Sequence, residues 1–157
     1  MGDIRSILVV CTGNSCRSVM AEGLLKKYLE EAGKSDVKVS SAGIMALDDS
    51  VPTAETKEVM EAHGIGMESF KSRRLTRQLI KDVDLILVME NMHRDFIVKM
   101  YPEAAAKTHL FKKFGSDNKR RYPEGLDVPD PIGSPIDFYK LSFEIIKEEA
   151  KRIADLI

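Results

Sequence analysis

The residues best suited to chemistry lie together near the N-terminus, in the stretch VVCTGNSCRS at residues 9–18. Cys11 is a nucleophile once ionised, and Arg17, six positions later, can grip two phosphoryl oxygens with its planar guanidinium. Gly13 and Asn14 tolerate left-handed backbone angles, which allow successive N–H groups to converge on an anion. The stretch therefore predicts an anion cradle with a nucleophilic sulfur at its floor.

The patterns on either side of this loop would position it. Residues 4–10 form a buried-strand pattern, and from Ser18 to Ala32 apolar residues recur at helical spacing. A loop between a strand end and a helix N-terminus presents unpaired N–H groups and the positive end of the helix dipole, a combination that binds phosphate-like anions. We therefore expect the thiolate form of Cys11 to be favoured.

Strand and helix patterns alternate along the rest of the chain. Further strands are expected at 36–43, 84–89 and 108–111, and further helices over 52–63, 91–100 and 137–157. This alternation predicts an α/β fold: a single three-layer domain over residues 1–157, with a four-stranded parallel sheet flanked by helices and the phosphate-binding loop after the first strand. The apolar face of the last helix is expected to consist of Phe138, Leu141, Ile145, Ile146, Ala150, Ile153 and Ile157.

The amino-acid composition limits the classes of protein to which the chain can belong. The chain has 157 residues, of which 43% are hydrophobic and 31% charged, and its formal net charge is −1. These values are typical of a soluble globular protein. A net charge this small gives no overall electrostatic field that would attract nucleic acid or an anionic membrane. No apolar run approaches the roughly 20 residues of a membrane span. Two cysteines are too few for a disulfide framework, so a cytoplasmic location is expected.

The stretch VCTGNSCRS resembles the active-site loop of the low-molecular-weight protein tyrosine phosphatases. The resemblance continues through SSAG (40–43), DLILVM (84–89) with His93 following, and DVPDPIGSPIDFYK (127–140), in the family's order. It implies a phosphomonoesterase that acts on phosphorylated proteins through a covalent phosphocysteine and needs no metal or other cofactor.

The resemblance also implies roles for single residues. Cys11 is the expected nucleophile, Arg17 the clamp on the phosphoryl oxygens, and Asp130 the general acid and then the general base. Asp127 is the rival acid, but Asp-Pro with a following glycine is the family's signature. The expected phosphate-binding residues are Thr12, Gly13, Asn14, Ser15, Cys16, Arg17 and Ser18, and the expected supports of the loop are Asn14, Ser18 and Ser41.

Ser15 bears on the substrate. Tyrosine-directed members usually carry a bulky aliphatic residue at this position, whereas the related protein arginine phosphatases carry a threonine, whose hydroxyl can bond a guanidinium. Ile132 and Gly133 follow Asp-Pro where tyrosine-directed members often have aromatics, and the loop after the second strand offers Met45 and Leu47. A phenyl ring would gain little from stacking here. Phosphotyrosine is the expected substrate, with phosphoarginine as the alternative.

Two other classes of protein share parts of this pattern. Thioredoxin-coupled arsenate reductases have a similar loop, but they pass a disulfide along further cysteines, and LILVMENMHRD (85–95) holds none. A non-catalytic phosphate-binding module would lack the nucleophile or the acid, and both are present here.

Cys16 indicates a redox role. The family uses such a second cysteine as reversible protection, so peroxide is expected to give a Cys11–Cys16 disulfide instead of an irreversible acid.

Overall fold

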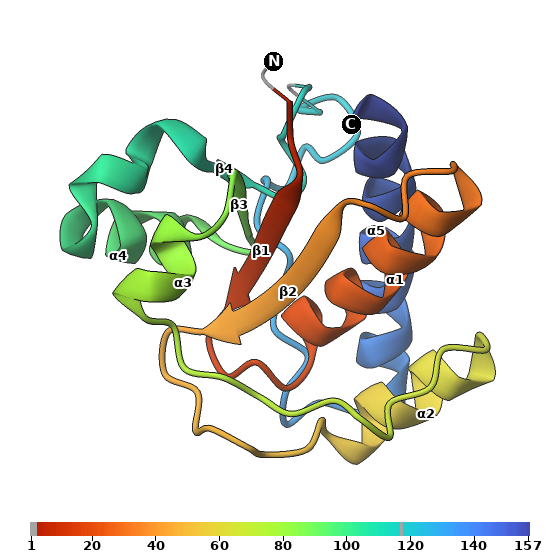
Figure 1. Cartoon of the computed structure of the whole chain (residues 1–157). Coiled ribbons are helices and arrows are strands. Elements are labelled where there is room, and N and C mark those ends of the chain that lie inside the picture. Colours follow the sequence, from red (N-terminus) through yellow and green to blue (C-terminus); the bar gives the residue numbers. More distant parts are fainter. Residues whose placement is uncertain (1–2, 117) are drawn as a thin grey trace.

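Four parallel strands form the centre of the fold, in the order β2-β1-β3-β4 (Figure 1). The computed structural model describes residues 3–116 and 118–157. The strands are β1 (Ser6–Cys11), β2 (Lys38–Gly43), β3 (Leu85–Val88) and β4 (Thr108–Leu110). Because all pairings are parallel, the carboxyl ends of the strands meet at one edge of the sheet, and Cys11 lies there opposite Gly43.

Helices cover both faces of this sheet, which confirms the predicted three-layer α/β fold (Figure 1). One face carries α1 (Arg17–Glu31), α2 (Ala54–Ala62) and α5 (Ile136–Leu156). The other carries α3 (Arg77–Lys81), α4 (Asn91–Met100) and the 3₁₀ helix η1 (Pro102–Lys107). None of the helices in the described ranges is both long and apolar enough to cross a membrane.

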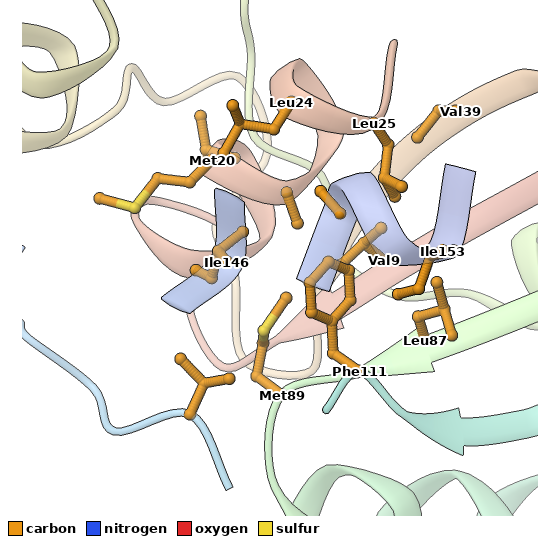
Figure 2. Packing of buried hydrophobic residues seen from close by; sticks show 14 of the residues in the cluster. Val9, Met20, Leu24, Leu25, Val39, Leu87, Met89, Phe111, Ile146 and Ile153 are labelled. Atoms are coloured by element: carbon orange, nitrogen blue, oxygen red, sulfur yellow. The ribbon is translucent and has the colours of Figure 1, made fainter. Parts of the chain in front are cut away.

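The apolar run of β1 is divided between the two faces. Ile7 and Val9 pack in the cluster formed with α1 and α5, whereas Leu8 and Val10 pack against the side of α3 and α4, and all four side chains are fully buried. In Figure 2, Val9 and Phe111 lie among residues of α1 and α5. Each such burial contributes about 1.5–3 kcal/mol, so β1 rigidly holds the start of the loop that follows it.

Some sequence-based boundaries differ from the structure. The helices α3 and η1 were not predicted, because five or six residues carry too little periodicity to identify a helix. The helix expected from residue 52 begins at Ala54, since the Thr53 side chain caps it by accepting a hydrogen bond from the Thr56 N–H.

The predicted apolar face of α5 is wrong in its first two turns. Phe138 and Leu141 are 53% and 62% exposed, whereas Ser142 is buried. Two polar side chains, Ser142 and Glu149, lie on the buried face because each has a partner there: the Ser142 hydroxyl is 3.5 Å from the Pro129 carbonyl, and Glu149 accepts hydrogen bonds from neighbouring side chains. Hydrophobicity alone assigns such satisfied polar residues to the surface.

Candidate active site

The segment between β1 and α1 turns its carbonyl oxygens away from its centre. The carbonyls of Cys11, Thr12 and Ser15 accept hydrogen bonds of 2.9–3.2 Å from backbone N–H groups of residues 44–53. Among residues 3–116 and 118–157, the N–H groups of residues 13–18 donate to no protein acceptor. Consecutive unpaired amides at the start of a helix are an arrangement that can bind an anion.

The Cys11 sulfur lies at the floor of this loop, 2.9 Å from the Ser18 hydroxyl oxygen, and is 3% exposed. The Asn14 side-chain amide donates to the Ser18 oxygen at 2.8 Å and to the Ser41 oxygen at 2.9 Å. An amide nitrogen can only donate, so the Ser18 oxygen accepts this bond and its own proton is free to point at the sulfur. The Ser18 hydroxyl can therefore donate a hydrogen bond to the Cys11 sulfur.

Asn14 also sets the shape of the loop. Its backbone is left-handed, with φ of 52°, and its side-chain oxygen accepts from the Arg73 N–H at 2.9 Å. Gly13 is absent from the residues with positive φ, so of the two residues that tolerate left-handed angles only Asn14 adopts one. The buried Asn14 side chain makes hydrogen bonds to Ser18, Ser41 and Arg73, and these contacts help to hold the unfavourable angle.

Arg17 lies almost fully buried beside the loop, 1% exposed. Its Nη1 donates to Glu90 Oε2 at 2.6 Å and to the Val128 carbonyl at 2.7 Å, and its Nη2 is 3.5 Å from Asp130 Oδ2. Within the described ranges, its Nε makes no hydrogen bond to protein. The Nε–Nη2 edge is thus available as a fork for two oxygens of a phosphoryl group.

The two candidate acids lie in different surroundings. Asp130 is 38% exposed beside Arg17, and its Oδ1 accepts from the Ile132 N–H at 3.1 Å. The Asp127 Oδ1 instead accepts from the Asn91 N–H at 2.8 Å, at the start of α4. The structure therefore brings Asp130 to the phosphate loop and engages Asp127 in holding a helix end.

Two site residues, Glu90 and His93, were not assigned a role from the sequence. His93 Nδ1 accepts from the Glu90 N–H at 3.0 Å, so the ring proton is on Nε2, which donates to Thr12 Oγ1 at 2.8 Å. Burial, together with the charge of Arg17, lowers the pKa of His93 to about 4, and the ring is neutral. The signal was an acid and a histidine three positions apart, directly after a buried strand.

Exposed aliphatic side chains surround this loop. Met45, Leu47 and Ile132 are 70%, 76% and 55% exposed, on the segments after β2 and after Asp130. Ser15 is half-buried in the loop, with its hydroxyl 3.6 Å from the Cys16 sulfur. The opening of the loop therefore combines the Ser15 hydroxyl with an aliphatic rim.

Comparison with known proteins identifies relatives of the whole chain. Residues 6–157 match the family described as low molecular weight phosphotyrosine protein phosphatase. The chain is 35% identical to the protein-tyrosine-phosphatase Etp of Escherichia coli, over 95% of both chains. It is also 35% identical to a protein-arginine-phosphatase of Geobacillus stearothermophilus, over 95% of this chain and 93% of that one. A mutant of the YwlE arginine phosphatase with a phosphorylated active-site serine superposes with a TM-score of 0.86 at 31% identity, over 96% of this chain and 94% of that one.

Proposed function

Because the chain belongs to the low molecular weight phosphotyrosine protein phosphatase family, we propose that it hydrolyses phosphotyrosine in proteins through a phosphocysteine on Cys11. The observation that carries this proposal is the loop itself: within the part of the chain that the structure describes, the amides of residues 13–18 have no protein acceptor, and the Cys11 sulfur beside them is hydrogen-bonded to Ser18. Such a loop favours a phosphoryl group directly above a thiolate.

Two steps of phosphoryl transfer follow from this arrangement. In the first, the Cys11 sulfur attacks phosphorus, the bond from phosphorus to the phenolic oxygen breaks, and protonated Asp130 gives its proton to that oxygen. In the second, the Asp130 carboxylate takes a proton from water, the water oxygen attacks phosphorus, and the sulfur–phosphorus bond breaks. The loop amides and Arg17 stabilise the charge on the three non-reacting oxygens in both steps.

Substitutions at three positions test this mechanism with p-nitrophenyl phosphate. Cys11→Ser is expected to abolish hydrolysis, and Asp130→Asn to lower kcat by about 10²–10⁴-fold, because it removes general acid–base catalysis. Asp127→Asn keeps an acceptor for the Asn91 amide and is expected to lose far less. Hydrolysis that survives in Cys11→Ser contradicts the mechanism, and thioredoxin-dependent reduction of arsenate would favour the reductase class instead.

Phosphoarginine is a second candidate substrate, favoured by the half-buried hydroxyl of Ser15. A hydroxyl in the loop can bond a guanidinium, whereas an aliphatic side chain packs better against a phenyl ring. Peptides carrying phosphotyrosine and phosphoarginine should therefore be compared with the wild type and with Ser15→Ile. Ser15→Ile is expected to raise kcat/KM for the phosphotyrosine peptide relative to that for the phosphoarginine peptide. An unchanged ratio of the two values would show that Ser15 does not determine the substrate preference.

We also propose that Cys16 protects the nucleophile in the cytoplasm. Both cysteines are unpaired thiols, as a reducing compartment requires, and the Cys16 sulfur lies 3.6 Å from Thr53 Oγ1. Oxidation of Cys11 by peroxide gives a sulfenic acid, and attack by the Cys16 thiol releases water and forms the disulfide. Peroxide-treated enzyme should recover its activity with dithiothreitol, and Cys16→Ser should recover much less; equal recovery contradicts this role.

A further inference from the structure

The first turn of α4 contacts three separate parts of the site. Glu90, the N-cap of α4, binds the guanidinium of Arg17, and His93 in the same turn binds Thr12 of the loop. The acid-bearing segment is held by the same turn, because Asp127 accepts from the Asn91 N–H, and the Val128 N–H donates to the Met89 carbonyl at 2.8 Å. Residues 89–93 therefore connect Arg17, the phosphate loop and the segment that carries Asp130.

Glu90 determines how the guanidinium of Arg17 is turned. The two hydrogens of Nη1 have two acceptors, Glu90 Oε2 at 2.6 Å and the Val128 carbonyl at 2.7 Å, on the side away from the free Nε–Nη2 edge. Two acceptors fix the rotation of a planar group, whereas one leaves it free to swing. The ion pair is largely removed from water, with side-chain exposures of 1% for Arg17 and 23% for Glu90.

We propose that Glu90 is a positioning residue, which holds Arg17 with its Nε–Nη2 edge turned to the phosphoryl group. This inference rests on the proposed phosphatase function and goes beyond it by assigning the residue that orients the arginine. Glu90 does not touch substrate in this role. Glu90 acts through the position of its carboxylate oxygen, which sets the position of the Arg17 guanidinium. A displacement of about 1 Å in a group that binds the transition state can lower the rate about a hundredfold.

His93 fixes Glu90 from the other side. Its Nδ1 accepts from the Glu90 backbone N–H, while its Nε2 donates to Thr12 Oγ1, so one neutral ring joins the start of α4 to the phosphate loop. In return the His93 backbone N–H donates to the Glu90 backbone carbonyl at 3.0 Å, so the two residues are joined by hydrogen bonds in both directions at this helix start. The position of the Glu90 oxygen is therefore determined by the helix and the loop together.

Two conservative variants distinguish the effect of the position of the Glu90 oxygen from the effect of its negative charge. Glu90→Gln keeps an acceptor at the same reach without the charge, and Glu90→Asp keeps the charge but withdraws the oxygen by one methylene. We expect kcat/KM for p-nitrophenyl phosphate to stay within about threefold of wild type in Glu90→Gln and to fall at least about tenfold in Glu90→Asp. The inhibition constant for inorganic phosphate should rise in Glu90→Asp only.

A matched control and a second background make the test specific. Glu103→Asp shortens a glutamate that is also 2.6 Å from an arginine, Arg77, but at the surface, and its kinetics should equal those of wild type. In an Arg17→Lys background, Glu90→Asp should add less than about threefold, because no guanidinium remains to be oriented. The midpoint of thermal unfolding of each variant separates lost positioning from lost folding.

The outcomes distinguish this inference from the proposed function. If Glu90→Gln is as damaged as Glu90→Asp, or if Glu90→Asp equals wild type while Cys11→Ser is inactive, the positioning role is wrong and the phosphatase mechanism stands. If Cys11→Ser retains hydrolysis, the mechanism itself is wrong.

Discussion

At the scale of single residues, the chemistry depends on which atoms carry protons. The side-chain nitrogen of Asn14 can only donate, so the Ser18 oxygen accepts this bond and its own proton is free to point at the Cys11 sulfur. In the same way the Glu90 backbone N–H can only donate, so the proton of His93 lies on Nε2 and is donated to Thr12. In both cases a nitrogen that can only donate determines where the neighbouring side chain, Ser18 or His93, directs its own proton.

The titration of His93 is a prediction at this scale. Its pKa is lowered from 6.5 to about 4, mainly by burial. Because the unfolded chain takes up this proton first as the pH falls, His93 reduces the free energy of unfolding between pH 6.5 and about 4, by roughly 3 kcal/mol in total, and adds no pH dependence above that range. NMR of the imidazole should show no titration above pH 5.5. A midpoint near 6.5 would contradict the assigned tautomer and burial.

Sequence reasoning was uneven for these residues. Cys11, Arg17, Asn14 and Ser18 could be predicted because they are neighbours in the chain and their types suit one anion site. Glu90 could not, because its role depends on the direction in which α4 leaves β3, and no local pattern encodes that direction.

At the scale of elements, the end of β2 supports the phosphate loop from below. Gly43 lies opposite Cys11 in the sheet, and its N–H donates to the Arg73 carbonyl at 2.9 Å. A β-carbon at Gly43 would lie 2.5 Å from the Thr12 carbonyl oxygen and 2.8 Å from the Asn14 nitrogen. Both are backbone atoms of the loop, so this close approach requires glycine.

Gly43→Ala is therefore expected to displace the loop and lower kcat/KM by about a hundredfold, since the amides no longer converge. The matched control is Gly23→Ala in α1, where alanine favours the helix and where the added carbon meets only side-chain atoms, the flexible end of Met60 at 2.5 Å and a methyl group of Ile65 at 3.1 Å. Steady-state kinetics and thermal unfolding of both variants provide the measurement. Normal activity in Gly43→Ala would show that the loop does not depend on this contact.

The elements themselves were largely predictable. The four strands and the long helices have clear periodicity, and apart from the short helices α3 and η1 the predicted order of strands and helices is the one in the structure. The prediction of the buried face of α5 was wrong in its first turns, which bury Tyr139 and Ser142 instead of Phe138 and Leu141. Which stripe of a helix is buried depends on the hydrogen bonds that its polar residues find in the folded state.

At the scale of the whole molecule, the parallel sheet assembles the site from distant segments. Cys11 ends β1, Ser41 lies in β2, Glu90 follows β3, and Asp130 comes from the long segment after β4. The carboxyl ends of parallel strands meet at one edge, so a single topology brings all four together (Figure 1). With a net charge of −1 the molecule has little long-range field, and substrate selection falls to the loop and its rim.

The central claim is that the phosphoryl group passes through the Cys11 sulfur. The most direct measurement is mass spectrometry of Asp130→Asn, quenched during turnover of p-nitrophenyl phosphate, because this variant lacks the base that hydrolyses the intermediate. We expect one phosphate, bound as a thioester of phosphoric acid to the peptide that contains Cys11 and absent when Cys11 is alkylated beforehand. Turnover with that peptide unmodified, or with the phosphate on another residue, would contradict it.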